Sequence, residues 1–92
     1  MKNVFVKVEN EFTANVLTNA VSAESTVNQK VGMSRKTGKL VMSITEANET
    51  AKALENYAKK TAHAASAKMA KTLATAIRFK TAAACKAVAL AA

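Results

Sequence analysis

The sequence has little of the chemistry that most catalytic and metal sites need. It contains one cysteine, one histidine and no aspartate, so all six acidic residues are glutamates. His63 has no cysteine or acid at a metal-ligand spacing, whereas a zinc site needs about four ligands. The glutamates form no recognisable catalytic pair, and two glycines, Gly32 and Gly38, are too few for a phosphate-binding loop. We therefore expect no enzyme activity, no cofactor and no metal site.

Disulfides and long apolar runs are also absent. Cys85 is the single cysteine, which excludes an intrachain disulfide and is typical of a reducing compartment. Near the N-terminus, Lys7, Glu9 and Glu11 interrupt the apolar residues, so we expect no signal peptide. No uncharged apolar run approaches the ~20 residues that a membrane span needs. These absences predict a soluble, cytoplasmic protein.

Large apolar side chains are scarce. Tryptophan is missing, and the aromatic residues are Phe5, Phe12, Tyr57 and Phe79. Hydrophobic residues make up 50% of the chain, but many are alanines, which bury little area each. The 92 residues suit one domain, near the size at which a single core is marginal. We therefore predict a single domain over residues 1–92 that forms a homodimer.

The dominant feature is the run 46–92, which is rich in alanine and lysine and contains neither glycine nor proline. Alanine and lysine are strong helix formers, so the run predicts a long helix. Ser43 lies three residues before Glu46, which is the spacing of a capping box, and Thr45 is a second candidate cap. A continuous helix would span about 70 Å, whereas a compact domain of this size has a radius of gyration of about 12 Å. We expect either a break near residues 79–81 or, preferably, pairing with a second copy.

On a helical wheel this run is amphipathic. The apolar sector holds Leu54, Ala58, Ala65, Met69, Leu73 and Ala76, with Ala51 and Ala62 beside them. The basic sector holds Lys60, Lys68, Lys71, Arg78 and Lys86, with Tyr57 and Phe79 near its edge. Glu55 and Lys80 fall inside or near the apolar sector and weaken the pattern. The small residues predict a seam that a partner helix or sheet approaches closely.

The first half of the chain predicts shorter elements. Residues 4–8 alternate as a strand that points Val4, Val6 and Val8 inward, and Asn10 is placed to cap a helix over about residues 11–23. Residues 27–33 and 40–44 suggest two strands joined at Gly38, which suits the positive φ of a hairpin turn. The expected fold is an α+β domain of order β-α-β-β-α, with a three-stranded antiparallel sheet in residues 1–45 and the long basic helix in 46–92.

The positive charge is unevenly distributed. The net charge is +8, and residues 1–55 hold seven basic residues against six acids. Residues 56–92 hold seven basic residues and no acid. Such asymmetry indicates a nucleic acid, an anionic membrane surface or an acidic protein as partner. A membrane-surface helix would need a face of Trp, Phe and Leu that is absent here. The remaining alternative is that the lysines only keep an alanine-rich helix soluble.

One short segment has a known counterpart. Lys59-Lys60-Thr61-Ala62, followed by alanines and Lys68, resembles the Lys-Lys-x-Ala start of the last helix in double-stranded RNA-binding domains. In that family the lysines contact phosphates across the groove, so the resemblance implies the same contact here. A glycine-rich approach before the lysines is missing, and the expected order of elements differs. The resemblance is therefore local and does not assign the chain to the family.

Together these patterns predict a non-enzymatic nucleic-acid-binding accessory protein, with RNA slightly favoured over DNA, that contacts phosphates without reading sequence. The candidate nucleic-acid-binding residues are Lys59, Lys60, Lys68, Lys71, Arg78 and Lys86 on the long helix and Arg35, Lys36 and Lys39 at the hairpin tip. The alternative is a small inhibitor of an acidic or nucleic-acid-handling protein, such as a toxin or defence nuclease, of the kind that phages encode.

Overall fold

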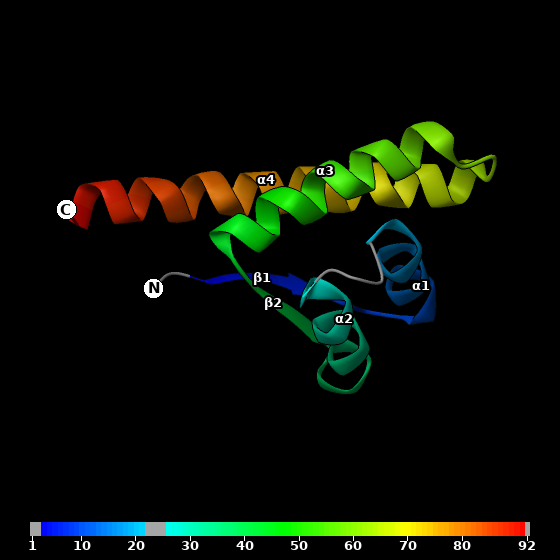
Figure 1. Ribbon diagram of the computed structural model, residues 1–92, viewed down its shortest axis with the longest axis horizontal. Helices are drawn as coiled ribbons and strands as arrows, with labels where there is room; N and C mark the ends of the chain where they lie inside the picture. Colours follow the sequence, from blue (N-terminus) through cyan, green and yellow to red (C-terminus); the bar gives the residue numbers. More distant parts are fainter. Residues whose placement is uncertain (1–2, 22–25, 92) are drawn as a thin grey trace.

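The computed structural model describes residues 3–21 and 26–91, and the side chains of residues 3–21 and 26–86. In this part of the chain four helices and two strands follow one another in the order β-α-α-β-α-α (Figure 1). The elements are β1 (Asn3–Lys7), α1 (Glu11–Ala20), α2 (Thr26–Thr37), β2 (Lys39–Ser43), α3 (Ile44–Lys60) and α4 (Ala64–Ala91). The α3–α4 hairpin runs along the longest axis of the molecule, and the other elements lie beneath it (Figure 1).

The sheet is two-stranded and antiparallel, with Val4 opposite Met42 and Val6 opposite Leu40. These four side chains are buried, as is Val8, because alternate residues of each strand point into the core. The strands predicted at residues 4–8 and 40–44 are therefore present, each within one residue of its predicted bounds. The third strand is not, so the prediction of a three-stranded sheet is wrong.

Residues 27–33, predicted as that third strand, lie in helix α2. Val27, Val31 and Ser34 are buried at steps of four and three residues, which is helical spacing, whereas Met33 is 60% exposed. Gly38 has the expected positive φ of 76°, but it ends a helix instead of turning a hairpin. Its N–H donates to the Ser34 carbonyl at 2.8 Å, which is the αL C-cap that glycine favours.

The expected helix over 46–92 is two helices joined at Thr61–His63. Its predicted start is confirmed by a capping box: the Glu46 N–H donates to Ser43 Oγ at 3.1 Å, and the Ser43 N–H donates to Glu46 Oε1 at 3.0 Å. The break lies well before residues 79–81, which continue α4 without interruption. Folding back brings the long dimension to 43 Å and the radius of gyration to 12.8 Å. The length argument for a projecting helix that pairs with a second copy therefore no longer holds.

Helices α3 and α4 lie side by side along most of α3 and bury the small-residue seam within the chain (Figure 1). The buried residues include Ala47, Ala51, Leu54 and Ala58 on α3, and Ala70, Leu73, Ala74, Ile77 and Thr81 on α4. The predicted sector is right for Leu54, Ala58 and Leu73, but Ala62 and Ala65 are exposed. The wheel assumed one uninterrupted helix, and the break at 61–63 changes the phase of every later position.

Candidate nucleic-acid interface

Among the described residues, three ion pairs use three of the basic side chains. Lys30 pairs with Glu46, Arg35 with Glu11, and Arg78 with Glu55. Each pair joins two different helices, so these cations hold the fold together. Both arginines among them were predicted to bind nucleic acid, and the structure gives each of them a partner inside the protein.

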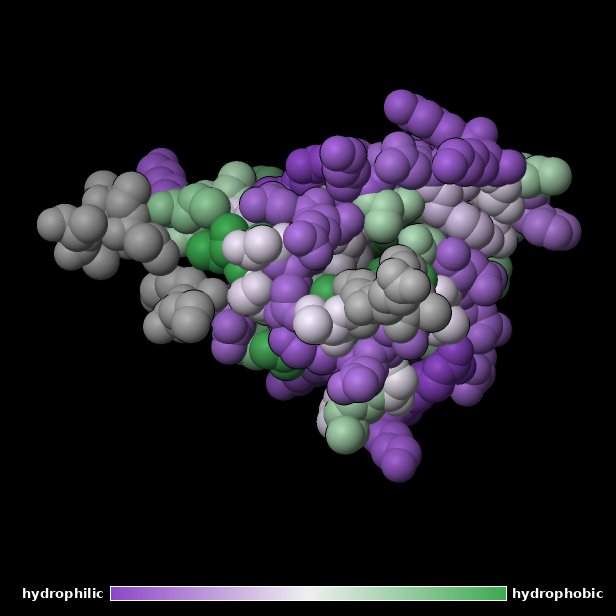
Figure 2. Space-filling view, in the orientation of Figure 1, coloured by the Kyte–Doolittle hydropathy of each residue, from purple (hydrophilic) through white to green (hydrophobic). Residues whose placement is uncertain are grey.

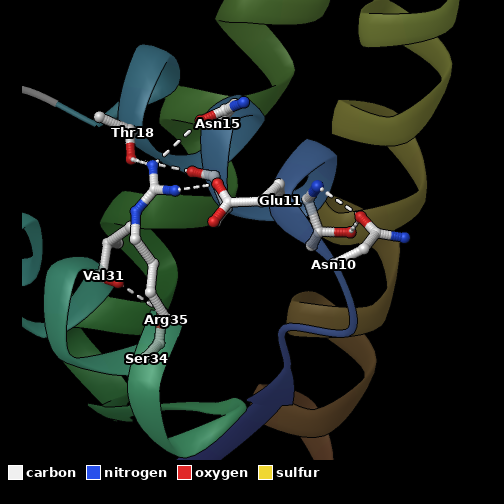
Figure 3. Close-up of polar contacts among 9 residues, drawn as sticks. Asn10, Glu11, Asn15, Thr18, Val31, Ser34 and Arg35 are labelled. Atoms are coloured by element: carbon white, nitrogen blue, oxygen red, sulfur yellow. Dashed lines mark hydrogen bonds and ion pairs between the residues drawn. The ribbon is translucent and has the colours of Figure 1, made fainter.

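Arg35 lies in the last turn of α2, not at a hairpin tip, and its guanidinium reaches across to α1 (Figure 3). Its Nη1 donates to Glu11 Oε2 at 2.5 Å, and its Nη2 donates to Asn15 Oδ1 at 3.0 Å and to Thr18 Oγ1 at 3.3 Å. The side chain is only 33% exposed. The three hydrogen bonds from this one guanidinium all go to α1, so Arg35 joins α2 to α1.

Arg78 forms a bidentate pair from α4 to α3. Its Nε donates to Glu55 Oε2 and its Nη2 to Glu55 Oε1, both at 2.7 Å. The hydrogen bonds from Arg78 hold the pKa of the Glu55 carboxyl below its usual range, and the nearby Lys59 charge acts in the same direction. Glu55, which weakened the predicted apolar sector, is thus the partner of Arg78. The guanidinium is directed towards α3, away from the outward face of α4.

The predicted lysines are all exposed and form no ion pair within the described residues. Lys59 and Lys60 end α3, where cations oppose the negative end of the helix dipole. Lys68, Lys71 and Lys86 lie on α4. The sequence predicted that Lys60 shares one helical face with these lysines. This is wrong, because the chain reverses at 61–63 and Lys60 lies on a different helix. Figure 2 shows hydrophilic side chains along the outer surface of the hairpin.

Lys36 and Lys39 flank the turn from α2 into β2, and Lys39 faces another lysine across the sheet. The register places Lys7 of β1 directly opposite Lys39, and both are exposed. Val8 N–H donates to the Gly38 carbonyl at 2.9 Å, so the next pair along, Lys7 with Lys39, is of the non-hydrogen-bonded type, in which side chains lie closest. Like charges opposed in this way destabilise a sheet.

Lys80 of α4 completes a cluster of three lysines. Its Nζ donates to the backbone carbonyl of Phe5 at 2.6 Å, which fixes the ammonium beside β1 without neutralising its charge. Lys7, Lys39 and Lys80 line one surface depression together with Phe5 and Val6. The sequence reasoning missed Lys7 and Lys80. The outward positions of β1 were available from its alternation, but only the correct β1–β2 pairing brings Lys7 to Lys39.

A second depression lies on α4 and adjoins the first at Lys80. It is lined by Lys71, Thr72, Thr75, Ala76, Phe79 and Lys80. Among the described residues, no glutamate lines either depression. We name the four basic residues of the two depressions, Lys7, Lys39, Lys71 and Lys80, the lysine track.

No three His, Cys, Asp or Glu side chains among the described residues are grouped so that they could hold a metal ion. His63, expected on a helix, is exposed in the turn between α3 and α4, and Cys85 is a free, exposed thiol. Within the same residues, no helix is long and apolar enough to cross a membrane.

No similar protein or structure was found for this chain. Comparisons with family models, with curated proteins and with solved structures each gave no match to this chain.

Proposed function

We propose that this protein is a non-enzymatic nucleic-acid-binding accessory protein that holds the phosphate backbone, with RNA slightly favoured over DNA. The observation that supports this most strongly is the lysine track: four exposed lysines from β1, β2 and α4 line two adjoining depressions that contain no described acid. Lys59, Lys60, Lys68 and Lys86 extend the positive surface beyond the track. A cytoplasmic setting belongs to the proposal and agrees with the free thiol of Cys85.

The track is costly for a fold that binds no anion. Lys7 and Lys39 oppose each other in the closest type of cross-strand pair, and Lys80 adds a third ammonium to the same depression. The protein has glutamates elsewhere that neutralise Lys30, Arg35 and Arg78, but none lies here. A phosphate would remove the repulsion, and the lysines would release the counterions that are condensed on the nucleic acid. Lysine ammonium groups are point charges, so the contact would carry no sequence preference.

The test is a binding titration against a labelled RNA and a DNA of the same mixed sequence, repeated over a range of salt concentrations. Four phosphate contacts predict a log–log salt slope of about −3 for a single strand. The triple variant Lys7→Gln, Lys39→Gln, Lys80→Gln should reduce that slope by about 2 and weaken binding strongly at low salt.

A matched control removes the same charge elsewhere. Lys52, Lys59 and Lys60 are exposed on α3 and line neither depression. Lys59 and Lys60 only extend the positive surface outside the track, so replacing all three by Gln should weaken binding much less. Equal losses in both triple variants would show that net charge alone attracts nucleic acid and would remove the track from the proposal. Absence of binding at low salt would overturn the proposed function.

A second candidate, inhibition of an acidic or nucleic-acid-handling protein, is favoured by a groove between α2 and β2. Met33 is 60% exposed and Val41 38% exposed in its wall, with Lys39 beside them. An exposed apolar strip next to a cation is typical of a surface that binds protein. If the unmodified protein binds no nucleic acid at low salt, Met33→Asp becomes the informative variant, and it should abolish inhibition of such a partner.

A further inference from the structure

Phe5 exposes a large apolar surface within the lysine track. It sits at the middle of β1 on the outward side of the sheet, opposite Val41, and is 53% exposed. Phe5 lines the same depression as Lys7, Lys39 and Lys80. The protein has few aromatic residues, and an exposed phenylalanine does not contribute the free energy that its burial in the core would provide. The position therefore suggests a ligand with a flat apolar face.

Phe79 repeats this arrangement on α4. It is 77% exposed, the most exposed large apolar side chain among the described residues. It lines the second depression with Lys71 and Lys80. Lys80 lines both depressions, so each of them combines Lys80 with an exposed phenylalanine, one from the sheet and one from the helix.

We propose that the track binds single-stranded nucleic acid, with bases stacking on Phe5 and Phe79 while the lysines hold the phosphates between them. This inference rests on the proposed function and names the form of its ligand. Aromatic rings interleaved with cations along a groove are what a single strand requires, because its bases are free to stack. In a duplex the bases are already stacked and their faces are covered, so both rings would be left without a partner.

The decisive experiment compares one sequence as a single strand and as a duplex, with Phe5→Leu and Phe79→Leu tested singly. Leucine keeps an apolar side chain and removes the ring. Each variant should weaken single-strand binding by roughly tenfold and leave duplex binding unchanged. Phe12→Leu is the matched control, since Phe12 is 41% exposed on α1 and lines neither depression. Its affinity for the single strand should equal that of the unmodified protein.

A second measurement does not depend on a loss of binding. The chain contains no tryptophan, so Phe79→Trp or Phe5→Trp introduces a single indole, whose emission can be excited separately from that of Tyr57. Stacking of a base on the indole should quench its emission when oligo(dT) or oligo(U) is added, and the quenching should saturate with retained affinity.

The outcomes separate this inference from the proposed function. If the unmodified protein binds single strands and duplexes alike, and the leucine variants match it, phosphate binding stands and stacking is refuted. Unquenched tryptophan emission at saturating oligonucleotide would refute stacking as well. If neither form of nucleic acid binds at low salt, the proposed function itself fails.

Discussion

One carboxylate, that of Glu46, joins the start of α3 to α2. Its Oε1 accepts from the Lys30 ammonium and from the Ser43 N–H, and its Oε2 accepts from Thr26 Oγ1 at 2.6 Å. Lys30 and Thr26 both belong to α2, the helix that the sequence reasoning took for a strand. These hydrogen bonds lower the pKa of Glu46 from 4.5 to about 2; the bond from Lys30 has the largest effect, followed by those from Thr26 and Ser43. The junction therefore depends on the charge of Glu46.

The contribution of the Glu46 charge to the free energy of unfolding follows from this pKa shift. A pKa that falls from 4.5 to about 2 on folding corresponds to about 3 kcal/mol, at 1.36 kcal/mol per unit. The Glu46 side chain is 14% exposed but Lys30 is 45% exposed, so solvent screens the pair and we expect about 2 kcal/mol. Because the folded pKa is the lower one, the stabilisation is complete above pH ~5 and is lost as the pH falls through about 2.

Urea denaturation followed by circular dichroism measures this effect in Glu46→Gln, which keeps one side-chain oxygen and removes the charge. The variant should be less stable by about 2 kcal/mol at pH 7 and by less than about 1 kcal/mol at pH 3, where the unfolded chain is already protonated. The pKa of Glu55 is also lowered, but that carboxyl is present in both proteins and cancels in the difference. Lys30→Met should remove most of the same pH dependence. A difference that stays constant between pH 7 and pH 3 would refute the reasoning and leave Glu46 as a neutral cap.

Two further predictions concern the backbone and the assembly. Gly38→Ala should cost about 1 kcal/mol, because φ is 76° and no atom lies within 4 Å of the added Cβ, whereas Gly32→Ala inside α2 should stabilise by up to about 1 kcal/mol in the same urea titration. The homodimer remains a prediction from the thin core, and Met33 and Val41 are now the apolar residues that a second copy could cover. Light scattering of the unmodified protein at micromolar concentration should give twice the chain mass, and a monomer would contradict it.

The elements that the sequence predicts correctly are those specified by near neighbours. Asn10 caps α1 through the Thr13 N–H at 2.9 Å, and Ser43 caps α3, because each cap needs only residues within one helical turn. The alternation of Val4, Val6 and Val8 likewise identifies β1 and its inner face. In each case the local pattern and the tertiary environment favour the same conformation.

The errors arise where tertiary structure decides between two readings of one pattern. Val27 and Val31 are β-branched, which favours a strand, yet they lie four residues apart and pack as one face of a helix. At Thr61–His63 no glycine or proline ends α3. The chain reverses there because a hairpin buries Leu54 and Ile77 within the protein, whereas a continuous helix would expose them.

The site was only partly predictable for the same reason. Lys39 was assigned to a hairpin tip, and Lys80 was regarded as an irregularity of the apolar sector. Both assignments were made because the sequence did not predict the chain reversal at 61–63 and paired residues 40–44 with 27–33 instead of with β1. Once β1 pairs with β2 and α4 lies beside β1, Lys39 faces Lys7, and Lys80 reaches the Phe5 carbonyl. Residues separated by 75 positions in the chain then form one surface, which no local pattern indicates.

The arginines and the lysines of this protein have different roles. Both arginines of the chain, Arg35 and Arg78, are in ion pairs between helices, while Lys30 is the only lysine so engaged among the described residues. A guanidinium presents several donors in a fixed plane, which suits a clamp between two elements, whereas an ammonium on a flexible stem suits a phosphate whose position varies along a strand. The charge of +8 is therefore not one undifferentiated surface. Its arginines stabilise the helix packing, and the described lysines other than Lys30 remain exposed for the proposed ligand.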